Sequence, residues 1–443
     1  MDEQSASAKG KGKKRPVNAR ALSASEIARN VGNFETWSTY QRCEQASYES
    51  DIPPHLKTDI SAIFNVTGML PQAWTDKTSE DFKLLELFAL PEHLVFLEDA
   101  AKHCPELFSD RVGTEAAKGL FAEIITIFTA WTRLRSMRLS KDKFSEADYA
   151  ANVYNLIRSP AIRASTQRGH CAIQLPQPSA DFSRTSQAVR VLSTKTAIPD
   201  CAIFIPSAST RALSHSASSP FRVLKGHPSI TSMGSTSAQS SFRYQSTPCA
   251  ALPSIPGFEF ASAFFEDKKP LHQMLEDAYR QNRMSTASAT RQLYALHIDA
   301  PVFGLVWSNG TVRAHVDWCK DEHGDPIVLS APYTGSGADG AFHEWKLDRP
   351  SDILQVYFLI RNIDKWTTGK FCERVIKGVN DLLKAIIVEE KTFKPWRRAG
   401  NLTTLLAKVQ KENANTSLTG TTSSSVPSPP KAKAKRRRTP MTR

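Results

Sequence analysis

Acidic residues and lysines stand at the ends of two short apolar segments of the sequence. Asp200, in a Pro-Asp dipeptide, precedes the segment CAIFI, and Glu266-Asp267-Lys268-Lys269 ends a segment that begins FEFASAFF. Side chains alternate between the two faces of a strand, so Glu266 and Lys268 project from one face and Asp267 and Lys269 from the other. If the two segments pair in a sheet, Asp200 and Glu266 form a pair of carboxylates whose repulsion a divalent cation would offset.

This arrangement is typical of phosphodiester hydrolysis. Carboxylate oxygens suit Mg²⁺ or Mn²⁺, which use only one or two carboxylates and keep waters for a substrate phosphate. A bound ion lowers the pKa of a coordinated water and stabilises charge in the transition state, while a neighbouring lysine holds and activates that water. We therefore expect Asp200 and Glu266 to bind the metal and Lys268 to act in catalysis. Asp267 and Lys269 fit a D-x-K pattern equally well, so this second frame stays open.

A third acid, Glu123, lies in the strongest helical segment of the sequence, residues 114–139. The apolar residues of this segment recur every three or four positions and form one stripe: Leu120, Ile124, Ile127, Phe128, Trp131 and Leu134. At about 100° per residue, Glu123 falls roughly 40° from Ile127 and roughly 60° from Leu120. Burying a lone carboxylate is costly, so we expect a cation or a hydrogen-bond donor beside Glu123.

The surrounding segments predict a mixed α/β fold. Helical spacing covers residues 80–160, and the two apolar segments that carry Asp200 and Glu266 have the character of strands. The elements expected after these strands are a helix, a hairpin and two further helices, at residues 271–296, 302–318, 351–364 and 370–390. This order indicates a mixed central sheet flanked by helices. The Ser- and Thr-rich residues 207–254 predict a long loop.

The hairpin is the clearest local prediction. Asn309-Gly310 supplies the two positive-φ positions of a type I′ turn. After the turn, apolar residues alternate with Arg313, His315, Asp317 and Cys319. This alternation predicts one buried face and one solvated face. We therefore interpret His315 and Asp317 as surface residues rather than as part of a metal cluster.

The order of these features resembles that of the PD-(D/E)xK nuclease-like domains: a helix glutamate, IPD at a strand, E-D-K at the end of the next strand, a Gln/Arg-containing helix and a hairpin. The part of the chain from SSFRYQSTPCA to SDILQVYFLIRNIDKWTTG is similar to members of this family from basidiomycete fungi, and the resemblance covers about residues 110–400. It implies a restriction-endonuclease-like fold and DNA as the substrate. The residue roles that it implies are metal ligation by Asp200 and Glu266, a catalytic Lys268, an accessory acid at Glu123, and Gln273 or Gln281 on the helix that approaches the substrate.

The spacing of the motif departs from the family pattern. Asp200 and Glu266 are 66 positions apart, whereas the motif normally joins them by a short hairpin. We therefore expect residues 207–256 to be a low-complexity insertion in a domain that spans residues 34–410. Residues 1–33 and 411–443 should be disordered tails, because they are polar, basic and without apolar periodicity.

Most of the net charge lies in the tails. Residues 1–20 carry six Lys/Arg and two acids, residues 431–443 carry seven Lys/Arg, and together these segments hold +11 of the net +13. The body is therefore nearly neutral, and only the tails predict salt-sensitive attraction to nucleic acid. The run Lys431–Arg438 is typical of a nuclear-import signal, so the nucleus is the expected location and the cytoplasm the alternative.

Cysteine spacing and hydropathy limit the remaining classes. The seven cysteines are scattered and never form CxxC, which predicts free thiols, Cys319 included, in a reducing compartment. The sequence contains no apolar run of about 18 residues, so we expect no membrane span. The leading hypothesis is a Mg²⁺-dependent nuclease or a degenerate relative that acts on DNA. The alternatives are a non-catalytic nuclear module that binds protein or nucleic acid, and a binder that uses only its tails.

Overall fold

The computed structural model describes residues 20–112, 114–178, 186–231, 242–268, 274–335 and 341–397. These residues belong to one compact unit, which ends at Ala399. Several of the predicted features lie outside the described residues: residues 1–19 of the N-terminal tail, Lys269, Gln273, the tail 411–443 and its basic run Lys431–Arg438.

The centre of the unit is a mixed sheet, as expected. Its described strands follow the order β1-β11-β10-β9-β8-β7-β4, with β12 paired to β10. The pairs β1–β11 and β8–β9 are parallel, and the other pairs are antiparallel. The strands of this sheet are β1 Cys43–Gln45, β4 Thr166–Gly169, β7 Cys201–Phe204, β8 Ala261–Lys268, β9 Val302–Ser308, β10 Thr311–Glu322, β11 Asp325–Pro332 and β12 Trp345–Lys346. Two smaller sheets pair β2 Leu70–Pro71 with β3 Phe108–Ser109, and β5 Ile173–Gln174 with β6 Thr196–Ala197.

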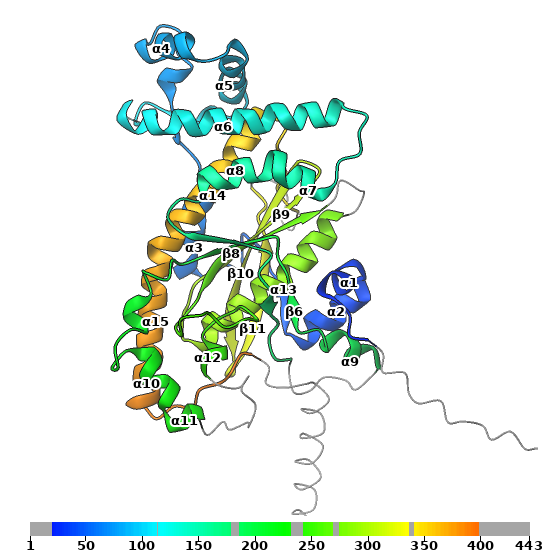
Figure 1. Cartoon of the computed structure of the whole chain (residues 1–443), viewed down its shortest axis with the longest axis vertical. Helices are drawn as coiled ribbons and strands as arrows, with labels where there is room; N and C mark the ends of the chain where they lie inside the picture. Colours follow the sequence, from blue (N-terminus) through cyan, green and yellow to red (C-terminus); the bar gives the residue numbers. More distant parts are fainter. Residues whose placement is uncertain are drawn as a thin grey trace, which may run out of the picture. The chain divides into compact units, whose positions relative to one another are not determined.

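Helices flank this sheet (Figure 1). The described α-helices are α1 Ala24–Arg29, α2 Val31–Tyr40, α3 Pro54–Phe64, α4 Glu80–Phe88, α5 Pro91–His103, α6 Thr114–Leu139, α7 Glu146–Tyr149, α8 Asn155–Ala161, α9 Ser186–Leu192, α10 Pro220–Gly226, α11 Pro228–Thr231, α12 Phe242–Gln245, α13 Met274–Ala295, α14 Pro350–Thr368 and α15 Lys370–Ile387. Within the described residues, no helix carries an apolar stretch that could cross a bilayer.

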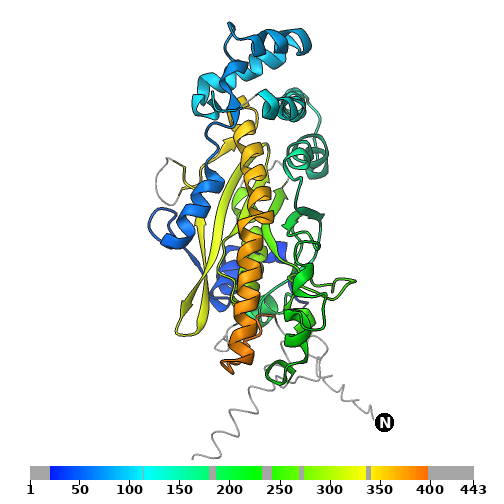
Figure 2. The ribbon, with the colours of Figure 1, turned by 90° about the vertical axis from the view of Figure 1, so that its left-hand side faces the viewer.

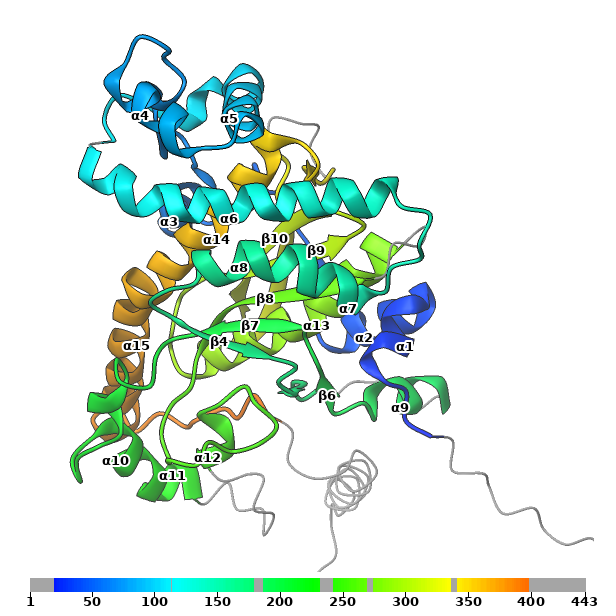
Figure 3. The same cartoon turned by 45° about the horizontal axis from the view of Figure 1, so that its top comes forward.

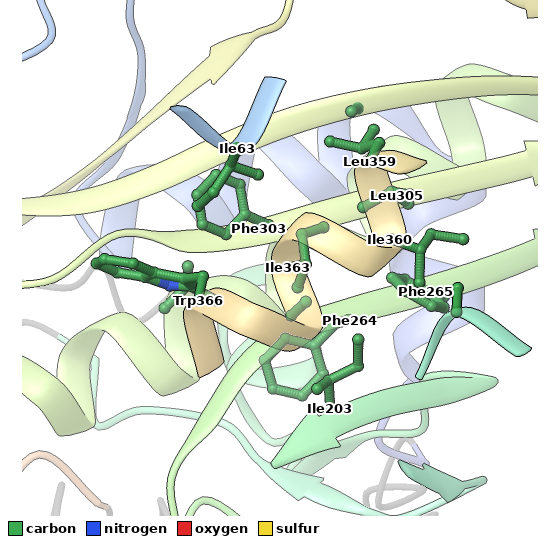
Figure 4. Packing of buried hydrophobic residues seen from close by; sticks show 14 of the residues in the cluster. Ile63, Ile203, Phe264, Phe265, Phe303, Leu305, Leu359, Ile360, Ile363 and Trp366 are labelled. Atoms are coloured by element: carbon green, nitrogen blue, oxygen red, sulfur yellow. The ribbon is translucent and has the colours of Figure 1, made fainter. Parts of the chain in front are cut away.

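Helices cover both faces of the sheet, and the central strand β9 is buried on both faces. All residues of β9 are buried. Phe303 and Leu305 point to one face, where Figure 4 shows them near isoleucines of α14. Val306 points to the other face and packs against Ala278 and Tyr279 of α13. Alternation along β9 therefore separates the side of the sheet covered by α13 from the side covered by α14.

The helices on the α14 side form more than one layer. Figure 2 shows α14 and α15 following one another along the sheet, and Figure 3 shows α6 beyond α8, which lies nearer to β8. The predicted helix at 114–139 matches α6, and its predicted apolar stripe is buried throughout. The periodicity identified this helix because one face packs against the core and the other does not.

The predicted hairpin is confirmed by β9 and β10. Asn309 and Gly310 have φ angles of 50° and 69°, as a type I′ turn requires. The prediction that its polar face is solvated is wrong, because His315 and Asp317 are both 0% exposed. This face lies against α13, where the side-chain oxygen of Asn282, Oδ1, accepts a hydrogen bond from His315 Nε2 at 2.9 Å.

The prediction of a long loop at 207–254 is also wrong. Helices α10, α11 and α12 occupy part of it, and Phe221 and Phe242 are buried. Their rings lie 5.5 Å and 5.8 Å from the ring of Phe258, between centroids, just before β8. A few widely spaced aromatic residues anchor this Ser-rich sequence, so no apolar periodicity is visible in it.

Regular structure also begins before residue 34. Ser23 caps α1 in a capping box with Glu26, and Ile27 is fully buried. The expected tail boundary at residue 33 is therefore wrong. A helix of six residues presents too few apolar positions to show a period in the sequence.

Candidate active site

Asp200 meets the end of β8 through the antiparallel pairing of β7 with β8. Cys201 pairs with Phe265, which places Asp200, one residue earlier, at the level of Glu266. The Asp200 N–H donates to the Phe265 carbonyl oxygen at 3.1 Å, and the Asp267 N–H donates to Asp200 Oδ2 at 2.6 Å. The strand pairing thus brings together two acids that are 66 positions apart in the sequence.

Glu266 and Lys268 lie on one face of β8, as the strand period predicted. Lys268 Nζ donates to Glu266 Oε1. In the parallel β8–β9 ladder Glu266 pairs with Val306, which faces α13, so Glu266 points to the same side of the sheet. The side chain of Glu266 is 2% exposed, and its second oxygen, Oε2, has no hydrogen-bond partner. A buried carboxylate oxygen without a partner is energetically costly and therefore unusual.

The surroundings raise the pKa of both carboxyl groups. Burial raises the pKa of Glu266 well above its usual range; Asp200 adds to this rise, and the Lys268 ammonium opposes it. Burial, together with the nearby Asp267, also raises the pKa of Asp200. Lys268 itself is held in the charged form, because Glu266 and Asp200 raise its pKa more than its own burial lowers it. The site therefore has an excess of acidic groups over cations.

The side chain of Asp267 lies on the opposite side of β8 and is bound there by an arginine. Arg158 of α8 binds it through both terminal guanidinium nitrogens, with an Nη1–Oδ2 distance of 2.9 Å, and the two side chains are 2% and 4% exposed. The same guanidinium lies 4.3 Å from the centroid of the Trp307 ring. Because Asp267 already has a cation, the frame formed by Glu266 and Lys268 is the one with a free carboxylate oxygen.

Glu123 lies in a separate cluster. It is 5% exposed, accepts a hydrogen bond from the Tyr357 hydroxyl and forms an ion pair with Arg163. Arg361 Nη1 is 3.4 Å from its Oε2. The expectation of a cation or donor beside Glu123 is therefore confirmed. Among the described contacts, however, none joins Glu123 to Asp200, Glu266 or Lys268.

Two further residues near the site were missed by the sequence analysis. His170, in the loop after β4, has Nδ1 3.7 Å from Asp200 Oδ1, and its side chain is 78% exposed. The backbone of His170 is left-handed, with φ 49°, and its N–H donates to the Asp200 carbonyl oxygen at 3.3 Å. Glu146, at the start of α7, raises the pKa of Lys268. Neither residue belongs to a sequence pattern, so only the fold places them here.

The structure describes only one of the two glutamines predicted near the substrate. Gln281 lies on α13, the helix that covers the Glu266 side of the sheet, and is 8% exposed. Gln273 lies just before α13, outside the described residues. The suggested roles of both in approaching a substrate stay predictions.

The cofactor predicted from these residues is a hard divalent cation of low ligand demand. Among the described residues no group of three or more His, Cys, Asp and Glu side chains is arranged to hold a metal. Mg²⁺ nevertheless commonly uses one or two carboxylates and completes its shell with water and phosphate oxygens. Asp200 and Glu266, with the unpartnered Glu266 Oε2, meet that smaller demand. The side chains of Asp200 and Lys268 are 17% and 14% exposed, whereas that of Glu266 is 2% exposed.

Comparison of the chain with protein-family models and with curated proteins finds no match.

Proposed function

We propose that this protein is a Mg²⁺- or Mn²⁺-dependent nuclease that hydrolyses phosphodiester bonds of DNA on a restriction-endonuclease-like fold. The observation that carries the proposal is the meeting of Asp200 and Glu266 beside Lys268, with one buried Glu266 oxygen left without a partner. Buried polar groups normally have partners, so an unpartnered carboxylate oxygen beside a second carboxylate supports the proposal of a cation at this site.

Each residue has a definite part in this proposal. Asp200 and Glu266 would hold the cation, and Lys268 would donate hydrogen bonds to the attacking water or to a phosphate oxygen. A charged lysine suits stabilisation of developing negative charge better than proton abstraction. A divalent ion, when bound, supplies a Lewis acid and a water of lowered pKa. The buried pair of Asp267 with Arg158 fixes the end of β8 that carries Glu266 and Lys268.

Its separate set of partners makes Glu123 a structural residue in this proposal rather than an accessory acid. Its carboxylate is already bound by Arg163 and Tyr357, and Arg361 is close. Its expected contribution is to hold α6 against α14, since Tyr357 and Arg361 both belong to α14. Activity per folded molecule should therefore be insensitive to its replacement.

DNA binding and nuclear import are assigned to the tails. The basic residues of 1–20 and 431–443 would attract phosphate without reading sequence, and Lys431–Arg438 would bind the import machinery. Removing residues 1–19 and 412–443 should abolish salt-sensitive DNA binding. Affinity that survives this removal with the same salt dependence would assign DNA binding to the body.

The decisive experiment measures cleavage and metal binding separately. Supercoiled plasmid and single-stranded DNA are incubated with Mg²⁺, Mn²⁺ or a chelator, and Mn²⁺ binding is followed by the loss of the free-ion paramagnetic resonance signal. Wild type should cleave only with metal. Glu266→Gln should lose both cleavage and Mn²⁺ binding, whereas Lys268→Met should lose cleavage and retain Mn²⁺ binding. Glu80→Gln, on the exposed surface of α4, serves as the matched carboxylate-to-amide control. Cleavage that persists in Glu266→Gln and Lys268→Met would refute the assigned roles.

A second candidate function is a non-catalytic interaction module. It is favoured by exposed apolar residues on α4, on α5 and between them, where large side chains are more than half exposed: Leu84 53%, Leu87 75%, Phe88 79%, Leu90 65% and Val95 60%. Exposed apolar patches on soluble proteins commonly mark contacts with other molecules. This function gains if wild type binds no Mn²⁺ and cleaves no DNA, while Leu87→Ser/Phe88→Ser lowers binding of an apolar dye without lowering stability.

A further inference from the structure

Two cysteines that are 78 positions apart in the sequence lie on neighbouring chain segments. Cys171 follows β4 directly after His170, and Cys249 precedes β8. An antiparallel bridge joins Ile173 to Cys249. Backbone hydrogen bonds flank this bridge, from the N–H of residue 174 to the carbonyl of 248 at 2.8 Å and from the N–H of 250 to the carbonyl of 172 at 2.7 Å. The pairing fixes both segments without any covalent link.

The two thiols interact with each other, and their environments differ. A hydrogen bond from the Cys249 thiol is the largest influence on Cys171 and lowers its pKa; burial opposes this, and the Arg168 guanidinium adds to it. The same hydrogen bond raises the pKa of Cys249, as do burial and Glu259. Cys249 is 6% exposed and Cys171 is half-buried. Cys171 is therefore the member of the pair that becomes the thiolate and that an oxidant in solution can reach.

The positive charge beside this pair is fixed in place. Arg168 Nη1 lies 3.8 Å from Cys249 Sγ, and its Nη2 lies 2.7 Å from Glu259 Oε1. The Thr247 hydroxyl donates to the other Glu259 oxygen at 2.6 Å. Glu259 neutralises part of the guanidinium charge and, with Thr247, holds the guanidinium beside the sulfur atoms.

The remaining cysteines lack this arrangement. All seven cysteines lie in the described residues, and none forms a disulfide. Burial is the largest influence on the other five and raises the pKa of each. The pKa rises to about 11 for Cys43 and to about 12 for Cys104, Cys201 and Cys319, and that of Cys372 is also raised. Reactivity toward oxidants requires thiolate character and access, so these five thiols should react slowly.

We propose that Cys171 and Cys249 form an oxidation site, at which a hydroperoxide converts the two thiols into a disulfide that links the segment after β4 to the segment before β8. This site does not depend on the proposed nuclease activity.

The chemistry balances with the hydroperoxide as the only oxidant. The Cys171 thiolate attacks the terminal peroxide oxygen, an S–O bond forms as the O–O bond breaks, and the released alkoxide takes a proton to become an alcohol, or water if the oxidant is hydrogen peroxide. The Cys249 sulfur then attacks the sulfenic sulfur of Cys171. The S–S bond forms as the S–O bond breaks, and the hydroxide leaves as water with the proton of the Cys249 thiol. Two thiols are oxidised by two electrons, and one peroxide is reduced.

A disulfide here would restrain the loop that carries His170 next to Asp200. The backbone already holds the two segments side by side, with Cys249 opposite Ile173 and diagonally across from Cys171. We expect the link to join these paired segments and to leave the fold intact.

The test uses the full chain and hydrogen peroxide in slight molar excess. Wild type should lose two of its seven free thiols, and peptide mapping without reductant should recover the two segments joined by Cys171 and Cys249. Cys249→Ser should stop at a sulfenic acid on Cys171 that a 1,3-diketone probe traps, and Cys171→Ser should lose no thiol at this dose. Cys372→Ser serves as the matched control and should behave like wild type. Recovery of a different pair from wild type, or an unchanged two-thiol loss in Cys171→Ser, would overturn the proposal. Mapping of wild type decides the matter even if a variant fails to fold.

Discussion

Adjacent acids on β8 provide the sharpest test of the site. Asp267 is bound by Arg158 on one side of the strand, whereas Glu266 faces the other side with a free oxygen. We expect Asp267→Asn to unfold easily and Glu266→Gln to remain stable but inactive. The two changes are chemically alike and one position apart, so each serves as the control for the other.

The magnitudes follow from the environments of the two side chains. Asp267→Asn leaves the Arg158 guanidinium, 2% exposed, without its counterion, and breaking a buried pair costs about 3–5 kcal/mol. Glu266→Gln removes a carboxylate whose pKa burial raises and which Asp200 repels, while Lys268 keeps the attraction of Asp200. The gain and the loss nearly cancel, so the free energy of unfolding should change by less than about 1 kcal/mol.

Urea unfolding followed by tryptophan fluorescence measures the first effect, and Trp307 beside Arg158 is a suitable internal reporter. Metal-dependent DNA cleavage, normalised to folded protein, measures the second. A double variant Asp267→Asn/Arg158→Met should recover much of the lost stability, because no uncompensated charge is then buried. Equal loss of stability in Glu266→Gln and Asp267→Asn would refute the reasoning, as would full cleavage by Glu266→Gln.

Three further predictions concern the surrounding fold. Burial lowers the pKa of His93 to about 4. The stability that the neutral His93 contributes is therefore complete above pH 6.5 and is lost as the pH falls toward 4, a loss of about 3 kcal/mol in the free energy of unfolding. His93→Phe should flatten the pH profile of the unfolding free energy. Gly304→Ala places a Cβ 1.9 Å from His315 Nε2, which should cost roughly 3 kcal/mol or prevent folding, as urea unfolding or soluble yield would show; a stable variant would contradict the packing. Glu123→Ala leaves the Tyr357 hydroxyl without its acceptor and should cost about 1–3 kcal/mol, with DNA cleavage per folded molecule unchanged; lost cleavage at full stability would restore the accessory-acid role.

The local elements were largely predictable from the sequence. The stripe of α6 and the Asn309-Gly310 turn appear as predicted, because each is encoded by residues within one helix or one turn. The shared face of Glu266 and Lys268 is equally local, since it depends only on the period of a strand. The mixed sheet followed from the order of these elements, whereas the anchored helices between 207 and 254 did not, because a few distant aromatic residues hold them.

Long-range pairing decided which of the candidate residues meet. The sequence alone determined that Asp200, Glu266 and Lys268 stand at strand ends, but the β7–β8 register decided that they meet there. The same packing pairs Asp267 with Arg158, places Glu123 against α14, and sets the polar face of β10 against the polar side of α13. The physical reason is that periodicity specifies the face on which a side chain lies, whereas the partner on that face is set by strand register and helix packing across distant segments.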